Sequence, residues 1–439
     1  MYKEILDKFV DKNIAILGFG REGKSTYKFL RRFFPNVKLT IVDKNINISS
    51  DSIFNDDKNV LFKLGDDYLS NLDDFDIIVK SSGISLNYID NKNIIERVVS
   101  QYSLVLENCN YNIIGVTGTK GKSTTSSLLY KVFKDNGKKT LLLGNIGVPI
   151  FDYIDEIDED TIVVLELSAY QLEYIKKAPK VSILLNLYEE HLDYFGSKDK
   201  YFNAKLNILN KQNEDDFGFY LDKNKDMINA KSKLFNIGKD IYIKDNYIYF
   251  NNNRLYDITS KRNLLGNHNL TNIMFVLGVA SIYNLDMDLV VDSINSFKGL
   301  EHRMELVGEY DGVIFYNDTI ATVPEATINC INTLGNVDTL IFGGMDRGIN
   351  YDDFVKYLRK SSISNFICMP EVGDRLGKLL EDTHKNIYYL SKMSDVVDMA
   401  KKVTRKGAIC LLSPAAPSYN DYKNFEEKGR IYKECIRND

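Results

Sequence analysis

A glycine-rich segment at residues 113–125 carries the residue types that hold phosphate groups. It reads Ile-Ile-Gly-Val-Thr-Gly-Thr-Lys-Gly-Lys-Ser-Thr-Thr and continues an apolar stretch at residues 111–116. Glycines let consecutive backbone N–H groups point at phosphate oxygens, and the helix expected at residues 123–133 adds the positive end of its dipole. Lys122 can reach the outer phosphates, and the Ser123 hydroxyl can bind Mg²⁺. The segment therefore predicts a nucleoside triphosphate site.

The glycine spacing differs from that of the usual phosphate loop. The position five residues before Gly121 is normally glycine and is Val116 here, and the glycines stand at 115, 118 and 121 instead. A flexible loop with a surface lysine would have the same composition. The apolar strand before the loop and the helix with one apolar face after it favour phosphate binding.

Two candidate metal ligands follow apolar stretches that are expected to be strands. Glu166 lies near the end of the stretch at 161–167, and His191 follows the stretch at 181–187 within an acidic cluster. Carboxylates rarely lie in buried strands without a partner, and their oxygens suit Mg²⁺. The carboxyl ends of parallel strands share one edge of a sheet, so both residues are expected beside the phosphate loop. The alternatives are a capping or ion-paired glutamate and a structural histidine.

Three other polar positions allow two interpretations each, and a fourth, Lys205, allows one. Asn269, after His268, begins an apolar helix and serves either as a helix cap or as an adenine contact. Arg303 either clamps a phosphate or forms an ion pair in a linker. Asp318 either holds ribose or metal or caps a strand end. Lys205 lies on a mixed helix at 199–209, and this pattern alone predicts a solvated side chain.

The first hundred residues contain a second phosphate-type motif. Gly18-Phe-Gly-Arg-Glu-Gly23 follows an apolar strand and opens a helix, and Asp43 ends the next strand about 20 residues later. This pattern is the Rossmann fingerprint, in which the acid binds a ribose hydroxyl. It predicts a nucleotide phosphate at a helix N-terminus but does not specify NAD. Ser81-Ser82-Gly83 follows another strand and is expected at the same sheet edge.

Strands and helices alternate along the whole chain, which predicts an α/β protein of three domains, each a mostly parallel sheet flanked by helices. We expect a Rossmann-like domain at 1–105, a phosphate-loop domain at 106–299 and a second Rossmann-like domain at 300–439. The strands expected from apolar runs lie at 13–17, 38–42, 77–79, 111–116, 161–167, 181–187, 313–316, 339–342 and 408–412, with hairpin strands within 241–255.

Length and composition narrow the class of protein. The chain has 439 residues, 44% of them hydrophobic and 27% charged, with a formal net charge of -5. No basic face dominates, which argues against nucleic acid as a partner, and no apolar run approaches the ~20 residues of a membrane span. Five scattered cysteines without a C-x-x-C pair are expected to be small core residues. We therefore expect a cytoplasmic protein that acts on small molecules without a membrane partner.

Taken together, the motifs resemble those of the Mur ligase family of peptidoglycan synthesis, in order and over nearly the whole chain. They are Gly115–Thr124, Gly144-Asn-Ile-Gly147, Leu165–Glu173, Asn186–Asp193, Ala204-Lys205, His268-Asn269, His302-Arg303, Asn317-Asp318, Leu412–Ser418 and Lys423–Glu427. The last two are similar to the C-terminal signature of the members that add glutamate.

The resemblance implies a role for individual residues. The residues expected to bind ATP are Gly118, Thr119, Lys120, Gly121, Lys122, Ser123, Thr124, Asn269, Arg303 and Asp318. Those expected to bind a UDP-linked substrate are Gly20, Arg21, Glu22, Asp43, Lys44, Ser82, Gly83, Asn145 and His191. Those expected at the amino-acid site are Thr322, Arg347, Ser418 and Phe425, and those expected to hold two Mg²⁺ ions are Ser123, Glu166, His191 and Lys205. Lys205 is implied to be carbamylated, contrary to the solvated side chain that its helix pattern predicts.

The implied activity is ATP-dependent addition of glutamate to UDP-N-acetylmuramoyl-L-alanine by a monomeric enzyme. The alanyl carboxylate attacks the γ-phosphate, the glutamate amine attacks the resulting acyl-phosphate, and phosphate leaves. Lys122, Glu166, His191 and Lys205 are the implied catalytic residues, acting through charge stabilisation.

Two departures bear on which enantiomer of glutamate is added. The family's D-glutamate members usually carry a lysine where this chain has Ile320, and a lysine after Gly-Gly where it has Arg347. A guanidinium holds a carboxylate differently from an ammonium. The pattern is similar to that of a subgroup that adds L-glutamate, so we expect D-glutamate and keep L-glutamate as the alternative.

Three other functions are less consistent with the sequence. A folylpolyglutamate synthase would not need the ~105 residues before the phosphate loop. An NAD-dependent oxidoreductase would leave that loop unexplained. A non-catalytic subunit related to these ligases would be expected to carry a four-cysteine zinc cluster, for which the scattered cysteines give no pattern.

Overall fold

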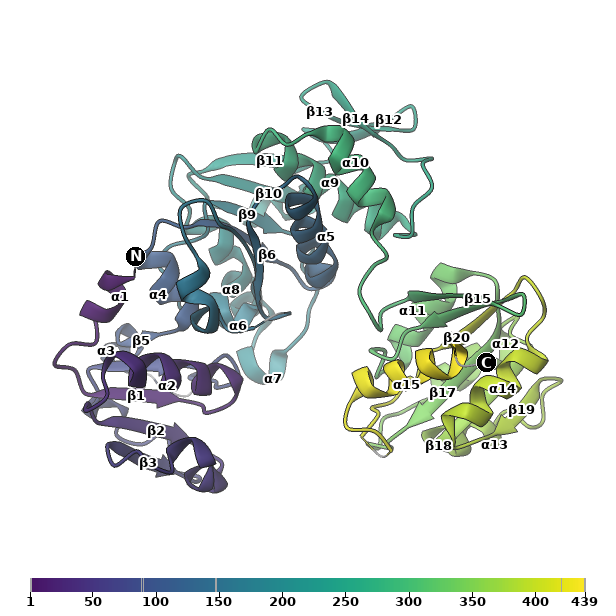
Figure 1. Cartoon of the computed structure of the whole chain (residues 1–439), viewed down its shortest axis with the longest axis horizontal. Coiled ribbons are helices and arrows are strands. Elements are labelled where there is room, and N and C mark those ends of the chain that lie inside the picture. Colours follow the sequence, from purple (N-terminus) through teal and green to yellow (C-terminus); the bar gives the residue numbers. More distant parts are fainter. Residues whose placement is uncertain (1, 88, 90, 147, 420, 438–439) are drawn as a thin grey trace. The chain divides into compact units, whose positions relative to one another are not determined.

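The computed structural model describes the whole chain except residues 1, 88, 90, 147, 420 and 438–439. The chain divides into two compact units, the first formed by Met1–Ser260 and His268–Ile294, and the second by Lys261–Asn267 and Asn295–Asp439. The first unit contains two sheets and the second contains one (Figure 1). The predicted α/β class with three mostly parallel sheets is confirmed, whereas the boundary expected at residue 105 falls inside the first unit and stays a prediction.

The first sheet is entirely parallel. Its strands run in the order β3 (Val60–Leu64), β2 (Leu39–Asp43), β1 (Ile14–Leu17), β4 (Ile77–Lys80) and β5 (Val98–Val99). The helices of this region are α1 (Lys3–Asp7), α2 (Arg21–Phe33), α3 (Lys92–Glu96) and α4 (Gln101–Asn108). β1 is the middle strand of this sheet, and all four of its residues are buried. The helix α2 packs against β1 and β4.

The second sheet carries the phosphate loop. Its strands run in the order β14 (Asn253–Asp257), β13 (Tyr247–Phe250), β12 (Ile241–Lys244), β11 (Lys233–Ile237), β10 (Phe217–Leu221), β9 (Val181–Leu184), β6 (Asn112–Thr117), β8 (Ile162–Glu166) and β7 (Thr140–Gly144). Its helices are α5 (Lys122–Asp135), α6 (Ala169–Leu172), α7 (Leu192–Phe195), α8 (Lys198–Asn210), α9 (Asn267–Ile282) and α10 (Met287–Ser296). The strands from β7 to β12 are parallel, so the carboxyl ends of β6, β8 and β9 meet at one edge.

An antiparallel hairpin completes this sheet, as the pattern at 241–255 predicts. β13 and β14 are joined through Asn251 and Asn252, which both have positive φ (49° and 66°). Asparagine tolerates this left-handed conformation better than most residues, which explains the tight turn.

The third sheet forms the core of the second unit. Its strands run in the order β15 (Glu305–Tyr310), β16 (Val313–Asn317), β20 (Ile409–Leu412), β17 (Val337–Gly344), β18 (Asn365–Glu371) and β19 (Asn386–Tyr389), with only β15 antiparallel. The helices are α11 (Pro324–Leu334), α12 (Asp352–Lys360), α13 (Val372–Lys378), α14 (Met393–Val403) and α15 (Phe425–Arg437). β17 and β20 are fully buried, and polar residues follow both.

Four of the five cysteines are buried. The fifth, Cys435, is partly exposed, and burial raises the pKa of its thiol. This agrees with the expectation that the cysteines are core residues.

The close packing of α2 against the loop after β1 requires glycine at position 23 of the first glycine motif. A Cβ at Gly23 would lie 2.0 Å from the backbone oxygen of Gly18, whereas a Cβ at Gly20 would have no atom within 4 Å. We therefore expect Gly23→Ala to destabilise the protein by roughly 1–3 kcal/mol, because the overpacked loop must move. Gly20→Ala is the matched control and should change the thermal unfolding midpoint little. Equal midpoints for the two variants would contradict this reasoning.

Candidate functional site

The phosphate loop lies between β6 and α5, with glycines where the backbone and its neighbours require them. Gly118 and Gly121 have φ of 152° and 89°. A Cβ at Gly118 would lie 2.7 Å from the Cβ of Leu185, and one at Gly121 would lie 2.9 Å from Oδ1 of Asn272. Val116, which stands at the usual glycine position, is a buried residue of β6, so the loop begins after it.

Neighbouring segments fix the shape of this loop. The Thr119 N–H donates to the Asn186 carbonyl oxygen at 2.7 Å, and the Lys120 N–H donates to Oδ1 of Asn186 at 2.8 Å. The Lys120 ammonium pairs with Glu190 at 2.8 Å. The strand end after β9 therefore supports the phosphate loop directly, as expected for motifs at one sheet edge.

Two lysines converge on one carbonyl oxygen of the loop. The Lys122 ammonium donates to the Gly118 oxygen at 3.0 Å and to the Thr119 oxygen at 3.1 Å. Lys205 Nζ donates to the same Gly118 oxygen at 2.9 Å and lies 4.9 Å from the Tyr201 ring centroid. Two ammonium groups on one acceptor repel each other, so one amine is expected to lose its charge.

Of Lys122 and Lys205, Lys205 is the one expected to be neutral. Its side chain is only 2% exposed, and burial, with a smaller contribution from the charge of Lys122, holds its pKa well below the ordinary value. The solvated side chain predicted from the pattern of residues 199–209 is therefore wrong. The helix α8 packs this face against α6 and β9, which the mixed sequence does not reveal.

Glu166 ends β8 beside the loop and is completely buried. Its Oε1 accepts a hydrogen bond of 2.7 Å from the Asn145 amide, whereas its Oε2 has no hydrogen-bond partner among the described residues. A buried carboxylate oxygen without a partner is unfavourable unless a cation or donor completes it. Glu166 therefore fits a cation that binds at the loop.

His191 lies at the start of α7 with a backbone in the left-handed region (φ 58°). Its side chain is 47% exposed and its Nε2 lies 3.9 Å from a Glu190 oxygen. Partial burial lowers the pKa of the imidazole, against the opposing charges of Glu190 and Asp193. The neutral ring keeps a lone pair available for a ligand.

These groups fit a magnesium ion only with help from outside their own side chains. No three His, Cys, Asp or Glu residues in the described part of the chain form a group that could hold a metal ion by themselves. Glu166 supplies one free oxygen, Ser123 adds a hydroxyl at the first turn of α5, and phosphate oxygens could supply the rest. The structure thus brings Lys122, Ser123, Glu166 and Lys205 to one place.

The expected adenine contact Asn269 lies in α9 and is buried. Its Oδ1 accepts a hydrogen bond of 3.2 Å from Asn272, the residue that faces Gly121. The beginning of α9 is therefore next to the phosphate loop. Sequence reasoning missed Asn272, whose only signal was its position one turn after Asn269.

The residues expected to bind the UDP-linked substrate, except Asn145 and His191, gather after the strands of the first sheet. Asp43 accepts backbone hydrogen bonds from Phe19 (2.7 Å) and Asn45 (2.8 Å), which pins the glycine loop. Arg21 and Gly20 are exposed at the start of α2, and Lys44 lies 3.7 Å from Asp66. Gly147, the last residue of the Gly144-Asn-Ile-Gly147 motif, lies outside the described residues.

Glu22 joins the first two sheets. Its carboxylate accepts hydrogen bonds from the Ser82 N–H and hydroxyl, from the Tyr102 hydroxyl and from the Gln171 amide, at 2.8–3.0 Å. Four donors saturate this carboxylate. Glu22 therefore orients the Ser82-Gly83 turn, and sequence reasoning gave no sign of this structural role.

In the second unit, Arg303 and Asp318 are neighbours. Asp318 is buried and accepts hydrogen bonds from the Met304 N–H (3.1 Å) and the Ser413 hydroxyl (2.9 Å). Burial raises the pKa of Asp318 to about 6, and the charge of Arg303 acts in the opposite direction. A ligand role and the alternative of a strand-end cap are both compatible with this geometry.

The raised pKa of Asp318 makes a prediction about pH and stability. Protonation favours the folded state, so its stabilising effect is complete below pH 3.8 and is lost as the pH rises to about 6. That change corresponds to ~3 kcal/mol. Between pH 4 and pH 7, Asp318→Asn should therefore gain stability relative to the wild type, measured by denaturant unfolding at each pH. If the difference in unfolding free energy between the two proteins stayed constant with pH, this would contradict the raised pKa of Asp318.

The expected amino-acid residues also lie in the second unit. Ser418 is buried and its hydroxyl has no hydrogen-bond partner among the described residues. Arg347 is exposed, with its guanidinium 5.6 Å from the Tyr419 ring centroid. Phe425 starts α15 with its ring 6.1 Å from His302, and Thr322 follows β16 by five residues.

Lys428 also lies in the second unit, and it was not identified from the sequence. It is 1% exposed and donates a hydrogen bond of 2.9 Å to the Gly343 carbonyl oxygen. Burial lowers its pKa to about 8. A lysine one turn into an amphipathic helix gives no sign of burial, because its position normally faces water.

No helix in the described part of the chain combines the length and apolar character that crossing a membrane requires.

Comparison with known proteins agrees with this arrangement. Residues 116–280 match the Mur ligase middle domain, and residues 302–416 match the Mur ligase glutamate ligase domain. A UDP-N-acetylmuramoylalanine–D-glutamate ligase of Clostridioides difficile is 33% identical, over 97% of this chain and 98% of that protein. A protein of the same name from Ruminiclostridium cellulolyticum is 33% identical, over 98% of this chain and 97% of its own length.

Solved structures share the fold at lower identity. A MurF ligase of Thermotoga maritima, in complex with ADP, is 16% identical with a TM-score of 0.56, covering 96% of this chain and 94% of that chain. The UDP-N-acetylmuramate–alanine ligase of the same organism is 17% identical with a TM-score of 0.57, covering 96% and 98%. Because the domain matches and the full-length relatives agree, the chain belongs to the Mur ligase family.

Proposed function

We propose that this chain joins D-glutamate to UDP-N-acetylmuramoyl-L-alanine with hydrolysis of ATP to ADP and phosphate. The observation that carries the proposal is the relatedness over 97–98% of this chain to proteins named for that reaction. The site supports it, because it offers cations, a free carboxylate oxygen and a phosphate loop at one sheet edge. Activating a carboxylate with ATP requires such a charged site and needs no side-chain nucleophile.

The reaction proceeds in two transfers. An oxygen of the alanyl carboxylate attacks the γ-phosphorus and ADP leaves, which gives an acyl-phosphate. The glutamate amine then attacks the acyl carbon, loses a proton, and phosphate leaves as the amide forms. Lys122 and the backbone N–H groups of the loop bind the phosphate oxygens, where they offset the negative charge that develops.

We propose that two Mg²⁺ ions bind here, with ligands from Ser123, Glu166, His191 and the carbamate of Lys205. When bound, the ions neutralise phosphate charge and polarise the reacting oxygens. The unpartnered oxygen of Glu166 supports its assignment as a metal ligand. The burial of Lys205 supports the carbamate, because an amine kept neutral by burial and by Lys122 can add CO₂ with release of a proton.

We propose that the substrates bind to three groups of residues. The phosphate-loop residues Gly118–Thr124 with Asn269, Arg303 and Asp318 bind ATP. The first sheet's Gly20, Arg21, Asp43, Lys44, Ser82 and Gly83, with Asn145 and His191, bind the UDP-linked substrate, and Glu22 contributes by orienting Ser82. Thr322, Arg347, Ser418 and Phe425 bind glutamate, and the free hydroxyl of Ser418 supports this last group. The expectation of a cytoplasmic monomer stays a prediction, which light scattering and cell fractionation test.

The decisive experiment measures phosphate release from ATP with UDP-N-acetylmuramoyl-L-alanine and either D-glutamate or L-glutamate. Release with D-glutamate alone supports the proposal. Release with L-glutamate alone overturns it and makes Ile320 and Arg347 the candidate specificity determinants, since both differ from the usual lysines. Release with neither enantiomer, from a protein that still binds ATP, overturns the substrate assignment.

A further inference from the structure

Tyr194 connects the first sheet to the segment that carries His191. Its hydroxyl donates a hydrogen bond of 2.7 Å to the Ile84 carbonyl oxygen and lies 3.1 Å from a Glu173 carboxylate oxygen. Its own carbonyl oxygen accepts hydrogen bonds from the Ser85 hydroxyl (3.3 Å) and from the Asn87 amide. One residue of α7 therefore holds the loop of residues 81–87 through three separate hydrogen bonds.

Both segments held by Tyr194 carry residues of the proposed site. The loop begins with the Ser82-Gly83 turn, which the carboxylate of Glu22 orients. At the other end, His191 lies three residues before Tyr194, in a left-handed conformation that few side chains adopt. Movement of one segment therefore changes the position of the other.

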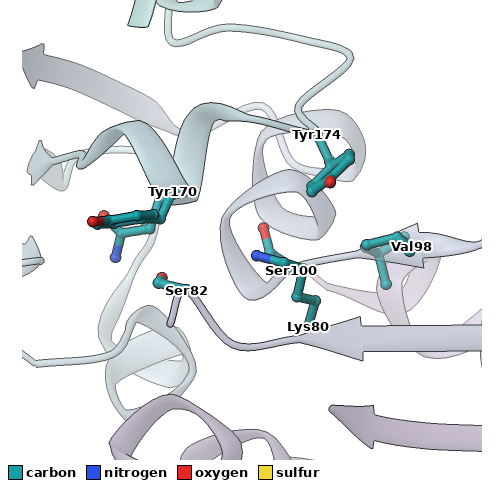
Figure 2. Close-up of a pocket in the computed structure, with 8 residues that line it drawn as sticks. Lys80, Ser82, Val98, Ser100, Tyr170 and Tyr174 are labelled. Atoms are coloured by element: carbon teal, nitrogen blue, oxygen red, sulfur yellow. The ribbon is translucent and has the colours of Figure 1, made fainter. Parts of the chain in front are cut away.

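Behind Tyr194, a buried lysine makes this connection rigid. Lys80, the last residue of β4, is 5% exposed, and its ammonium lies 5.5 Å and 5.6 Å from the ring centroids of Tyr174 and Tyr194. Figure 2 shows Lys80 and Val98 on strands of the first sheet, with Tyr170 on α6 and Tyr174 on the turn that follows it. The cavity between them measures about 10 Å³, room for about one water molecule.

Buried charges of opposite sign lie around Lys80, between the two sheets. Burial lowers the pKa of Lys80 to about 8, against the opposing effects of the Glu173 and Glu22 carboxylates. Burial likewise raises the pKa of Glu173, against the charge of Lys80. Separating the two sheets would remove the Tyr174 and Tyr194 rings from the Lys80 ammonium, and the Lys80 charge from Glu173.

We propose that Tyr194 is a positioning residue that couples binding of the UDP-linked substrate at the first sheet to binding of the metal–nucleotide pair at the phosphate loop. The inference rests on the proposed function, because it takes the Ser82 turn and His191 as parts of those two sites. Such coupling is reciprocal, so each ligand changes the affinity of the other by the same factor.

The test measures the affinity for UDP-N-acetylmuramoyl-L-alanine by calorimetry, with and without Mg²⁺ and a non-hydrolysable ATP analogue. In the wild type we expect the nucleotide to change this affinity about five-fold or more. Tyr194→Phe removes the hydroxyl, and with it one of the three hydrogen bonds to the 81–87 loop, but keeps the ring, whose centroid lies 4.5 Å from that of Tyr170. It should roughly halve the factor. Its KM for the UDP-linked substrate should change far more than its kcat. An unchanged coupling factor in Tyr194→Phe overturns the proposal.

Two further variants separate the role of Tyr194 from a general effect. Tyr174→Phe removes another phenol beside Lys80 and Glu173, and no hydrogen bond from Tyr174 to the 81–87 loop is found among the described residues. It should keep the coupling factor of the wild type, and a loss of coupling equal to that in Tyr194→Phe would overturn the proposal.

Asn87→Ala removes the hydrogen bond that the 81–87 loop donates to the Tyr194 carbonyl oxygen. It should also reduce the coupling factor, and it tests the proposal even if Tyr194→Phe fails to fold. A wild type that binds both ligands without coupling overturns this inference alone, whereas one that binds no UDP-linked substrate overturns the proposed function.

Discussion

Replacing Lys205 with alanine is expected to lower kcat by about 10²–10³-fold, the range measured when one preorganised stabilising group is lost. The physical reason is the burial of this amine beside Lys122 on the oxygen of Gly118. The alanine variant would lack the carbamate that we propose as a metal ligand. Steady-state kinetics at saturating ATP measures the effect. Lys198→Ala, an exposed lysine of the same helix α8, is the control and should keep the wild-type kcat.

The carbamate itself can be tested apart from the side chain. Wild-type protein freed of dissolved CO₂ should lose activity and regain it when bicarbonate is added. The Lys205→Ala variant should respond to neither treatment, and ¹³C-labelled bicarbonate should give a carbamate resonance only in the wild type. Full activity without CO₂ would show that Lys205 acts as a plain amine.

Glu166→Gln is expected to reduce kcat by about 10²-fold and to raise the Mg²⁺ concentration for half-maximal activity at least ~10-fold. The substitution keeps the shape of the side chain and can keep the Oε1 contact with Asn145. It removes the charge from Oε2, the buried oxygen without a partner. Titrating Mg²⁺ at fixed ATP measures the change.

The control for this prediction is Glu189→Gln, which neutralises an exposed carboxylate in the loop after β9. Its Mg²⁺ dependence should match that of the wild type. If Glu166→Gln also showed the wild-type dependence, the free oxygen of Glu166 would not be a metal ligand, and another donor would have to complete it.

Several central strands could be predicted from the sequence because burial on both faces leaves continuous apolar runs, although the central strands β10 and β18 were not expected. β6, β8 and β9 are such strands, and their order along the chain placed Glu166 and the phosphate loop at one edge. Edge strands do not give this signal. β3 has no fully buried residue and β5 has only two residues, so neither was expected.

The chemical state of the site was harder to predict than its location. Residue type and spacing identified Lys122, Glu166 and Lys205, but the helix pattern around Lys205 predicted exposure. Burial of that lysine depends on how α8 packs against α6 and β9, which is a tertiary contact. The roles of Glu22 and Tyr194 in joining two sheets likewise depend on residues sixty or more positions apart in sequence.

The buried thiols make this chain suitable for attaching a single fluorescent label. Four of its cysteines are buried, and the raised pKa of the fifth keeps its reactive thiolate scarce. A new cysteine in the Asn251-Asn252 turn would therefore react first with a maleimide dye. Six strand spacings separate β14 from β6, so the dye would stand roughly 30 Å from the phosphate loop. At that distance it can follow the molecule by fluorescence without touching the reacting groups.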